Sequence, residues 1–219
     1  MRNFIFDFNG TLFPDMDIHR LAWKRFMARY GVTITDEIFE RRMYGPANDA
    51  IMRMFLGEDL TREAVDRLSR EKEAVYREIA LADPALQKLA PGAAQALDML
   101  KLRGVPCAVA TASIFENVRF YMDDLGLSRW FDYDHVFYDT DDLPGKPDPA
   151  IYRLTMARLG YAPQDTTVVE DSLSGIRSAA GAGVGRIIAI DTTLGPDALS
   201  RMPEVDAVIH GFNGFERFI

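Results

Sequence analysis

Two kinds of apolar pattern occur along this chain, and they predict strands and helices in alternation. Short, nearly unbroken apolar runs rich in aromatic and β-branched residues are typical of buried strands. They predict strands at residues 3–8, 105–111, 135–138, 166–169, 186–190 and 207–209. Apolar positions at helical spacing predict helices at residues 91–103, 112–126, 149–160, 175–182 and 197–202. Unbroken apolar strands that alternate with helices indicate a parallel sheet covered on both faces.

The stretch between the first two strands has a different pattern, with almost no strand signal. Its apolar spacing, with Gly and Pro at the boundaries, predicts four successive helices at residues 19–30, 36–43, 47–56 and 61–81. Thr61 is the expected N-cap of the last of these helices. We therefore predict a doubly wound α/β core of residues 1–13 and 85–219, interrupted after its first strand by a four-helix cap of residues 14–84.

Composition and charge narrow the possible functions. Asp and Glu total 33 against 25 Lys and Arg, and a net charge of −8 without a basic run argues against nucleic acid or an anionic membrane as partner. The single Cys107 excludes an internal disulfide and suits a reducing compartment. No apolar run reaches the length of about 18 residues that a membrane span needs. The N-terminus turns polar at Asp7, too early for a signal peptide. We expect a cytoplasmic monomer.

Polar residues follow four of the predicted strands at their carboxyl ends, where open parallel sheets bind ligands. They are Asp7 and Asn9 at the end of the first strand, Thr111 and Ser113 at the end of the second, Lys146 beyond the third, and Glu170 and Asp171 at the end of the fourth. Carboxylates suit a divalent cation, while hydroxyl and ammonium groups suit phosphate oxygens. This combination predicts a site for a phosphate held beside a metal ion.

The same motifs, in this order, make the sequence similar to the haloacid dehalogenase (HAD) superfamily, in the branch with a helical cap. The motifs are Asp7-Phe-Asn9-Gly-Thr-Leu12, Thr111, Lys146 within Gly-Lys-Pro-Asp-Pro, and Glu170-Asp171 within Val-Val-Glu-Asp-Ser-Leu-Ser-Gly-Ile. The last motif and the cap opening His19-Arg-Leu-Ala-Trp23 resemble β-phosphoglucomutase-like and phosphoglycolate phosphatase-like enzymes. The resemblance covers the whole chain and implies a Rossmann-like core and an Mg²⁺-dependent phosphatase acting on a small phosphorylated metabolite, expected to be a sugar phosphate.

The resemblance also implies roles for the motif residues near the metal and the phosphate. Asp7 would be the nucleophile and would form a phosphoaspartyl intermediate. Mg²⁺ would be held by the Asp7 carboxylate, the backbone carbonyl of Asn9, and Asp171, with Glu170 as an outer partner. Lys146 would offset the negative charge of Asp7 and the phosphate.

Residues expected to contact the substrate surround these groups. Thr111 and the backbone near Gly10, Ala112 and Ser113 would bind the phosphoryl oxygens. In the cap, His19 is a candidate substrate contact. So is Asn48, in the segment 44–48 between two cap helices, although it is equally well explained as a helix N-cap.

Asn9 departs from the family pattern. The family's phosphatases have an Asp two residues after the nucleophile, which protonates the leaving group and then activates water. Asn9 cannot transfer a proton in this way, and general acid–base catalysis is typically worth about 10²–10⁴-fold. Four explanations are open: His19 takes over the role, the leaving group needs little protonation, the Asn9-Gly10 pair deamidates to a carboxylate, or an introduced Asn traps the enzyme.

Structural explanations exist for the individual residues as well. Asp7 alone would be read as a turn residue, Lys146 as a solvated loop lysine, and Thr111 or Ser113 as helix caps. Four motifs in order favour catalysis, with a phosphatase as the leading hypothesis. The alternatives are a phosphomutase of the β-phosphoglucomutase type and, because of Asn9, a catalytically impaired protein that binds a phosphorylated ligand.

Overall fold

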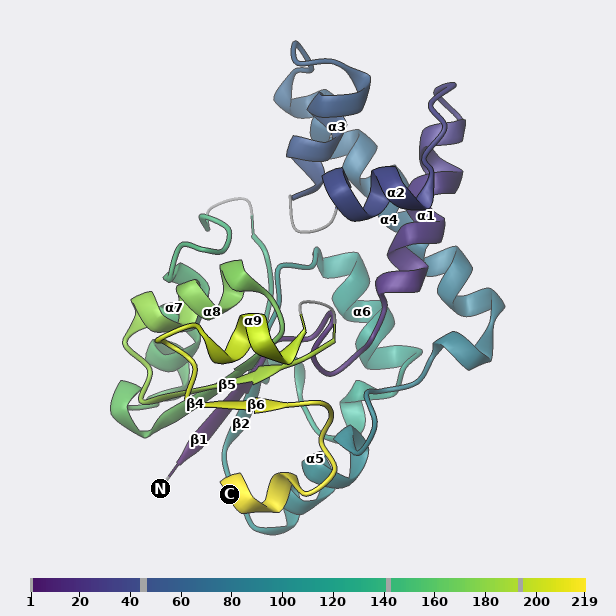
Figure 1. Ribbon diagram of the computed structural model, residues 1–219. Coiled ribbons are helices and arrows are strands. Elements are labelled where there is room, and N and C mark those ends of the chain that lie inside the picture. The colour runs from purple at the N-terminus through teal and green to yellow at the C-terminus, as the bar shows by residue number, and fades with distance from the viewer. Residues whose placement is uncertain (1, 44–46, 141–142, 193–194) are drawn as a thin grey trace. The chain divides into compact units, whose positions relative to one another are not determined.

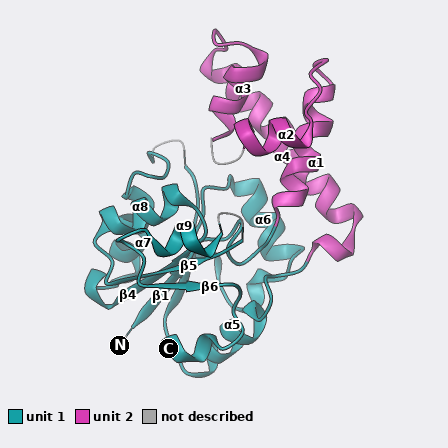
Figure 2. Ribbon diagram, viewed as in Figure 1, with its two compact units in different colours: residues 1–14, 88–219 teal, residues 15–87 magenta. Residues whose placement is uncertain are grey.

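The computed structural model describes residues 2–43, 47–140, 143–192 and 195–219. The chain folds into two units (Figure 2). The first is built from residues 1–14 and 88–219, and the second from residues 15–87. Within the first unit, the backbone N–H of Ala90 donates to the carbonyl of Leu12 at 2.8 Å, so the segments on either side of the second unit are joined by a hydrogen bond.

A six-stranded parallel sheet runs through the first unit (Figure 1). In spatial order its strands are β3 (Val136–Phe137), β2 (Cys107–Ala110), β1 (Asn3–Phe6), β4 (Thr166–Glu170), β5 (Arg186–Ile190) and β6 (Ala207–Ile209). β1 is central, and its Ile5 aligns with Ala108 on one side and Val168 on the other. The chain builds the sheet outward from β1 in both directions, so the predicted doubly wound parallel sheet is confirmed.

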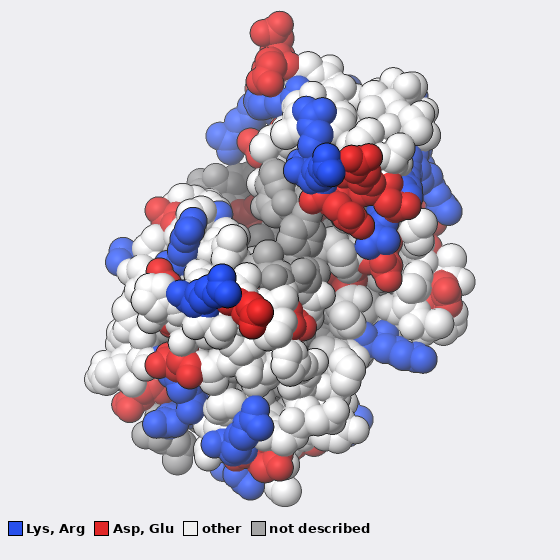
Figure 3. All heavy atoms as spheres, viewed as in Figure 1, with Lys and Arg blue, Asp and Glu red and all other residues white. Residues whose placement is uncertain are grey.

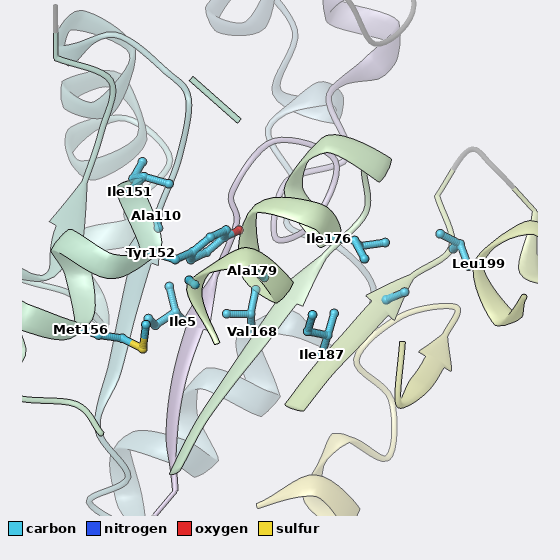
Figure 4. Close-up of a cluster of buried hydrophobic side chains, with 12 residues drawn as sticks. Ile5, Ala110, Ile151, Tyr152, Met156, Val168, Ile176, Ala179, Ile187 and Leu199 are labelled. Carbon is cyan, nitrogen blue, oxygen red and sulfur yellow. The ribbon is translucent and has the colours of Figure 1, made fainter. Parts of the chain in front are cut away.

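Helices and the C-terminal segment cover both faces of this sheet. The helices are α5 (Ala93–Leu102), α6 (Phe115–Asp123), α7 (Ala150–Leu159), α8 (Leu173–Ala182) and α9 (Pro196–Ser200). Ile5 of β1 belongs to a buried cluster with Tyr152 of α7 and Ile176 of α8 (Figure 4). On the opposite face, the rings of Phe4 and Phe6 lie 5.6 Å and 6.0 Å from that of Phe215. Because β1 is covered on both faces, Phe4, Ile5 and Phe6 are all apolar, whichever face of the sheet each one points to.

Three strands are shorter than predicted. β3 is only Val136–Phe137, and hydrogen bonds outside the sheet compete for the ends of β1 and β2. β1 stops at Phe6, since residues 8–13 close a tight turn in which Gly10 N–H donates to Phe13 O at 2.7 Å and Phe13 N–H donates to Phe8 O at 2.9 Å. β2 starts at Cys107 and not at Val105, whose N–H still donates to Leu100 O at the end of α5.

The second unit is helical. Its helices are α1 (Met16–Ala28), α2 (Asp36–Ile38), the π-helix η1 (Phe39–Met43), α3 (Asn48–Leu56) and α4 (Arg62–Ala82). Thr61 is the N-cap of α4, as predicted, and accepts a hydrogen bond from Ala64 N–H at 3.2 Å. The helix predicted at residues 36–43 is instead one α-turn that continues as a π-helix. In this wider turn Phe39 and Met43 are both buried in the unit's core.

Charged side chains of both signs are interspersed on the face shown in Figure 3. Within the described ranges, no helix combines the length and apolar composition that crossing a bilayer requires. The single cysteine, Cys107, is a free thiol at the start of β2, and burial raises its pKa to about 12.

Candidate active site

The carboxyl ends of β1 and β4 hold Asp7 and Glu170 around the ammonium of Lys146. Lys146 Nζ lies 2.6 Å from Asp7 Oδ1 and 2.7 Å from Glu170 Oε1, and it donates to the carbonyl of Ala110 at 3.2 Å. The N–H of Asp7 donates to Val169 O at 3.0 Å, which extends the sheet pairing one residue past β1 and fixes the carboxylate at the sheet edge. Three charged groups, all buried, therefore form one network.

Electrostatic attraction keeps this network charged despite its burial. Burial alone lowers the pKa of Lys146, but the carboxylates of Asp7 and Glu170 outweigh it and raise that pKa well above its ordinary value. Burial likewise raises the pKa of Glu170. The Lys146 ammonium and hydrogen bonds from Ser172 and Tyr152 outweigh this effect, so the pKa of Glu170 falls below its ordinary value. Lys146 and Glu170 are both ionised at neutral pH.

Glu170 also organises the loop that leads into α8. Its Oε2 accepts hydrogen bonds from the N–H groups of Asp171 and Ser172 at 2.9 Å and 3.0 Å, while its Oε1 accepts from the Tyr152 hydroxyl at 3.0 Å. A Cβ on Gly175 would lie only 1.7 Å from Oε1, so the absence of a side chain at Gly175 makes room for the carboxylate. Both oxygens of Glu170 thus have protein partners, which suits an outer partner of a metal more than a direct ligand.

Asp171 packs against the turn that follows Asp7. Its Oδ1 accepts from the Thr11 hydroxyl at 3.3 Å, and a Cβ on Gly10 would lie 2.2 Å from its Oδ2. Gly10 also has a φ of 78°, which disfavours any other residue. Asp7, Glu170 and Asp171 each offer a carboxylate oxygen, all within 4.8 Å of one another. This buried acidic cluster fits a hard divalent cation, which prefers oxygen ligands.

Asn9, Thr111 and Ser113 also come together at this edge. The hydroxyls of Thr111 and Ser113 donate to Asn9 Oδ1 at 3.2 Å and 2.7 Å. α6 begins at Phe115 with Ile114 as its N-cap, so neither Thr111 nor Ser113 caps it. The remaining residue of this loop, Ala112, is exposed and lines a small hollow with Gly145 and Lys146.

The Asn9-Gly10 pair is held in a geometry that opposes deamidation. That reaction needs the backbone nitrogen of Gly10 to attack the side-chain amide carbon of Asn9. In the structure Gly10 N–H donates to Phe13 O, and both ends of the Asn9 amide are hydrogen-bonded. Attack must therefore wait for local opening of the turn. We expect the native protein to keep Asn9 intact during prolonged incubation at mildly alkaline pH, as measured by the mass of the peptide that contains it.

The matched control is the same incubation in denaturant, where the turn is lost and this peptide should gain the mass that marks conversion of amide to acid. Equal conversion in native and denatured samples would show that the turn gives no protection.

In the second unit, His19 belongs to a hydrogen-bonded cluster around Lys72. Lys72 Nζ lies 2.8 Å from His19 Nδ1 and 2.7 Å from Glu73 Oε1, and His19 Nε2 lies 3.3 Å from Asp15 Oδ2. Both ring nitrogens of the histidine thus have partners within the unit.

Asn48 joins this cluster from α3. Its side-chain amide donates to Glu73 Oε1 at 2.8 Å. The N-cap of α3 is Ala47, and Asn48 is the first helical residue, so the explanation of Asn48 as an N-cap is wrong. Residues 44–46 of the segment that we expected to contact substrate lie outside the described residues.

Glu73 should make the stability of the second unit depend on pH. Burial raises its pKa, but Lys72, His19 and the Asn48 amide outweigh burial and lower the pKa from 4.5 to about 2. A carboxyl with a lowered folded-state pKa stabilises the fold fully above its unfolded pKa, and this contribution disappears as pH falls through the folded value. At about 1.4 kcal/mol per pKa unit, Glu73→Gln should cost about 3 kcal/mol near neutrality and almost nothing near pH 2.

Trp23 offers a selective measurement of this effect, since its ring packs within the second unit and Trp130 belongs to the first. In a Trp130→Phe background, denaturant unfolding followed by Trp23 fluorescence should show the Glu73→Gln penalty shrinking between pH 6 and pH 3. A penalty that stays constant across this range would contradict the assignment.

Several polar partners of the candidate site residues escape the sequence analysis. Tyr121 and Tyr152 lie at apolar positions of α6 and α7, so helical spacing identifies them only as core residues. Lys72 and Glu73 lie in a helix rich in charged residues, where the pattern predicts exposed side chains, yet both are buried. The sequence signal that could identify such residues is a hydroxyl-bearing or charged residue at a position whose helical spacing predicts burial.

Comparison with known proteins places this geometry among related folds. A family model described as haloacid dehalogenase-like hydrolase matches residues 1–183. A phosphorylated carbohydrates phosphatase of Thermotoga maritima is 31% identical over 190 residues, which are 87% of this chain and 85% of that protein. Hexitol phosphatase A of Escherichia coli is 29% identical over 210 residues, 95% of this chain and 90% of that protein. The crystal structure of a HAD hydrolase, family IA, variant 3, from Entamoeba histolytica matches with a TM-score of 0.91 at 30% identity, covering 98% of this chain and 95% of that one.

Proposed function

Because the chain belongs to the haloacid dehalogenase-like hydrolases, we propose that it is an Mg²⁺-dependent phosphatase that acts on a small phosphorylated carbohydrate through Asp7. The observation that carries the proposal is the network in which Lys146 lies within hydrogen-bond distance of both Asp7 and Glu170. The relatives named for phosphorylated carbohydrates and hexitol phosphates support the substrate class.

In the proposed reaction, Asp7 forms a bond to phosphorus and the bond from phosphorus to the leaving oxygen breaks. Water then attacks the phosphoaspartate, which releases phosphate and restores Asp7. Lys146 holds the Asp7 carboxylate in place and reduces the repulsion between this anion and the phosphate. The Thr111 hydroxyl and the backbone of Gly10, Ala112 and Ser113 bind the phosphoryl oxygens.

Mg²⁺ would be held by the carboxylates of Asp7 and Asp171 and by the backbone carbonyl of Asn9, with Glu170 outside the direct ligands. When bound, the ion supplies positive charge that offsets the charge of the transferring phosphoryl group. Glu170 orders the loop that carries Asp171 by accepting its backbone N–H.

The test is phosphate release from a panel of phosphorylated carbohydrates and phosphoglycolate, with Mg²⁺ or with EDTA, for this protein and for Asn9→Asp. Release that requires Mg²⁺ supports the proposal. Isomerisation of a hexose 1-phosphate without phosphate release would instead make the protein a phosphomutase. Thermal stabilisation by a sugar phosphate with no product, in the protein and in Asn9→Asp, would make it a binding protein.

A further inference from the structure

The side chain of Asn9 is part of a closed ring of hydrogen bonds. Asn9 Nδ2 donates to the Tyr121 hydroxyl at 2.9 Å, the Tyr121 and Ser113 hydroxyls are 2.9 Å apart, and Ser113 donates to Asn9 Oδ1 at 2.7 Å. The Thr111 hydroxyl adds a second donor to Oδ1. Tyr121 is buried, and its ring stacks on Phe8 with centroids 4.1 Å apart, so the ring of hydrogen bonds rests on a fixed side chain.

The donors and acceptors of this ring suit an amide. An amide nitrogen only donates, so the Tyr121 hydroxyl accepts from Asn9 and donates to the Ser113 hydroxyl, which in turn donates to the amide oxygen. An ionised carboxylate has no hydrogen to donate. If Asp replaced Asn9, the three contacts of the ring would share only the two hydroxyl hydrogens of Tyr121 and Ser113, so one contact would no longer be a hydrogen bond. The surroundings of residue 9 are therefore complementary to a neutral group that both donates and accepts.

The Lys146 ammonium, at the same edge of the sheet, already donates its hydrogen bonds to the protein. Lys146 has three hydrogens, and its Nζ has three acceptors within hydrogen-bond distance: Asp7, Glu170 and the carbonyl of Ala110. An amide can stabilise a leaving oxygen by donating a hydrogen bond, but it keeps its proton. Neither Asn9 nor Lys146 therefore supplies a proton to the leaving oxygen, and this oxygen must leave as an anion.

We infer that the protein is selective for phosphates carried on an acidic oxygen: an acyl, enol, phenol or anomeric oxygen, and not the oxygen of an ordinary alcohol. In the first step the bond from Asp7 to phosphorus forms while the bond from phosphorus to oxygen breaks, and the oxygen leaves as an anion that takes its proton from water. Among phosphorylated carbohydrates, this favours a phosphate on the anomeric carbon or on a carboxyl group over a phosphate on a primary hydroxyl. This inference rests on the proposed function.

The experiment compares two phosphates of similar size whose leaving groups differ in acidity, para-nitrophenyl phosphate and benzyl phosphate. The quantity measured is the ratio of their kcat/KM values, in this protein and in Asn9→Asp. General acid catalysis is worth about 10²–10⁴-fold, and an Asp supplies it mainly to the poorer leaving group. We expect the ratio to be larger in the unmodified protein than in Asn9→Asp by a factor of this size.

Two further variants test whether the ratio depends on the lack of a transferable proton at residue 9 or on the ring of hydrogen bonds. Asn9→Ala removes the ring and supplies no proton, and Tyr121→Phe breaks the ring while Asn9 stays, so both should keep a high ratio. A ratio in the unmodified protein no larger than in Asn9→Asp would overturn the inference. If Asn9→Asp does not fold, equal kcat/KM values for the two substrates in the unmodified protein would do so.

These outcomes are distinct from failure of the proposed function. If the inference alone is wrong, phosphate release still depends on Asp7 but shows little dependence on leaving-group acidity. If the proposed function is wrong, no Asp7-dependent release occurs from either substrate.

Discussion

Replacing Asp7 with Asn is expected to reduce phosphatase turnover by about 10⁴-fold or more, the size of loss seen when a covalent nucleophile is removed. The carbonyl oxygen of the new amide still accepts a hydrogen bond from Lys146, but the amide cannot attack phosphorus as a carboxylate does. The protein should stay folded, since Asn has nearly the same shape and Glu170 continues to pair with Lys146. Steady-state phosphate release on the best substrate of the panel is the measurement.

Asp165→Asn is the matched control for this substitution. Asp165 is exposed and lies just before β4, at the amino end of the strand whose carboxyl end carries Glu170. The control should retain full turnover, and both variants should match the unmodified protein in thermal unfolding. Turnover of Asp7→Asn within about tenfold of the unmodified protein, a barrier change of only about 1.4 kcal/mol, would show that Asp7 is not the nucleophile.

Lys146→Met is expected to destabilise the first unit strongly. It leaves the carboxylates of Asp7 and Glu170 buried without their cation, and breaking a buried pair in this way costs about 3–5 kcal/mol. Denaturant unfolding in EDTA, followed by Trp130 fluorescence in a Trp23→Phe background, measures the loss without help from bound metal.

Two comparisons make this result specific to the charge network. Lys88→Met removes an exposed ammonium and should change the free energy of unfolding by less than about 0.5 kcal/mol. Adding Glu170→Gln to Lys146→Met should recover part of the lost stability, because one uncompensated charge disappears. A loss in Lys146→Met no larger than in Lys88→Met would mean that Lys146 does not stabilise these carboxylates.

The sheet and its carboxyl edge were predictable because their signals are local. Short runs of β-branched and apolar residues mark β4 and β5. The polar residues that end the strands mark the sheet edge at which Asp7, Thr111 and Glu170 lie. The end of β1 was predicted two residues late, since the tight turn at Gly10 depends on a hydrogen bond to Phe13 that hydrophobicity does not report.

The hydrogen-bond partners of the site residues were not predictable from the pattern of apolar and polar positions along the chain. Tyr121 and Tyr152 each reach the site with a hydroxyl oxygen, and the ring of Tyr152 lies 5.0 Å from the Lys146 ammonium, while both side chains are buried as apolar residues would be. Helical spacing predicts which residues are buried but not which polar atom each one reaches. The same limit hides the pair of Lys72 and Glu73, whose ammonium and carboxylate satisfy each other inside a helical unit.

The central position of β1 also has a consequence for the order in which the chain can assemble. β1 is made first during synthesis, yet its neighbours in the sheet, β2 and β4, begin at Cys107 and Thr166. Residues 15–87 are synthesised before β2 and β4, so the helical unit has all of its own residues early. β1 can pair with its neighbours only after the chain has closed two long loops. Until then its apolar side chains are open to contacts with other chains. A nascent chain shortened before β4 carries every residue of the helical unit, but its Asp7 follows a strand with only one neighbour.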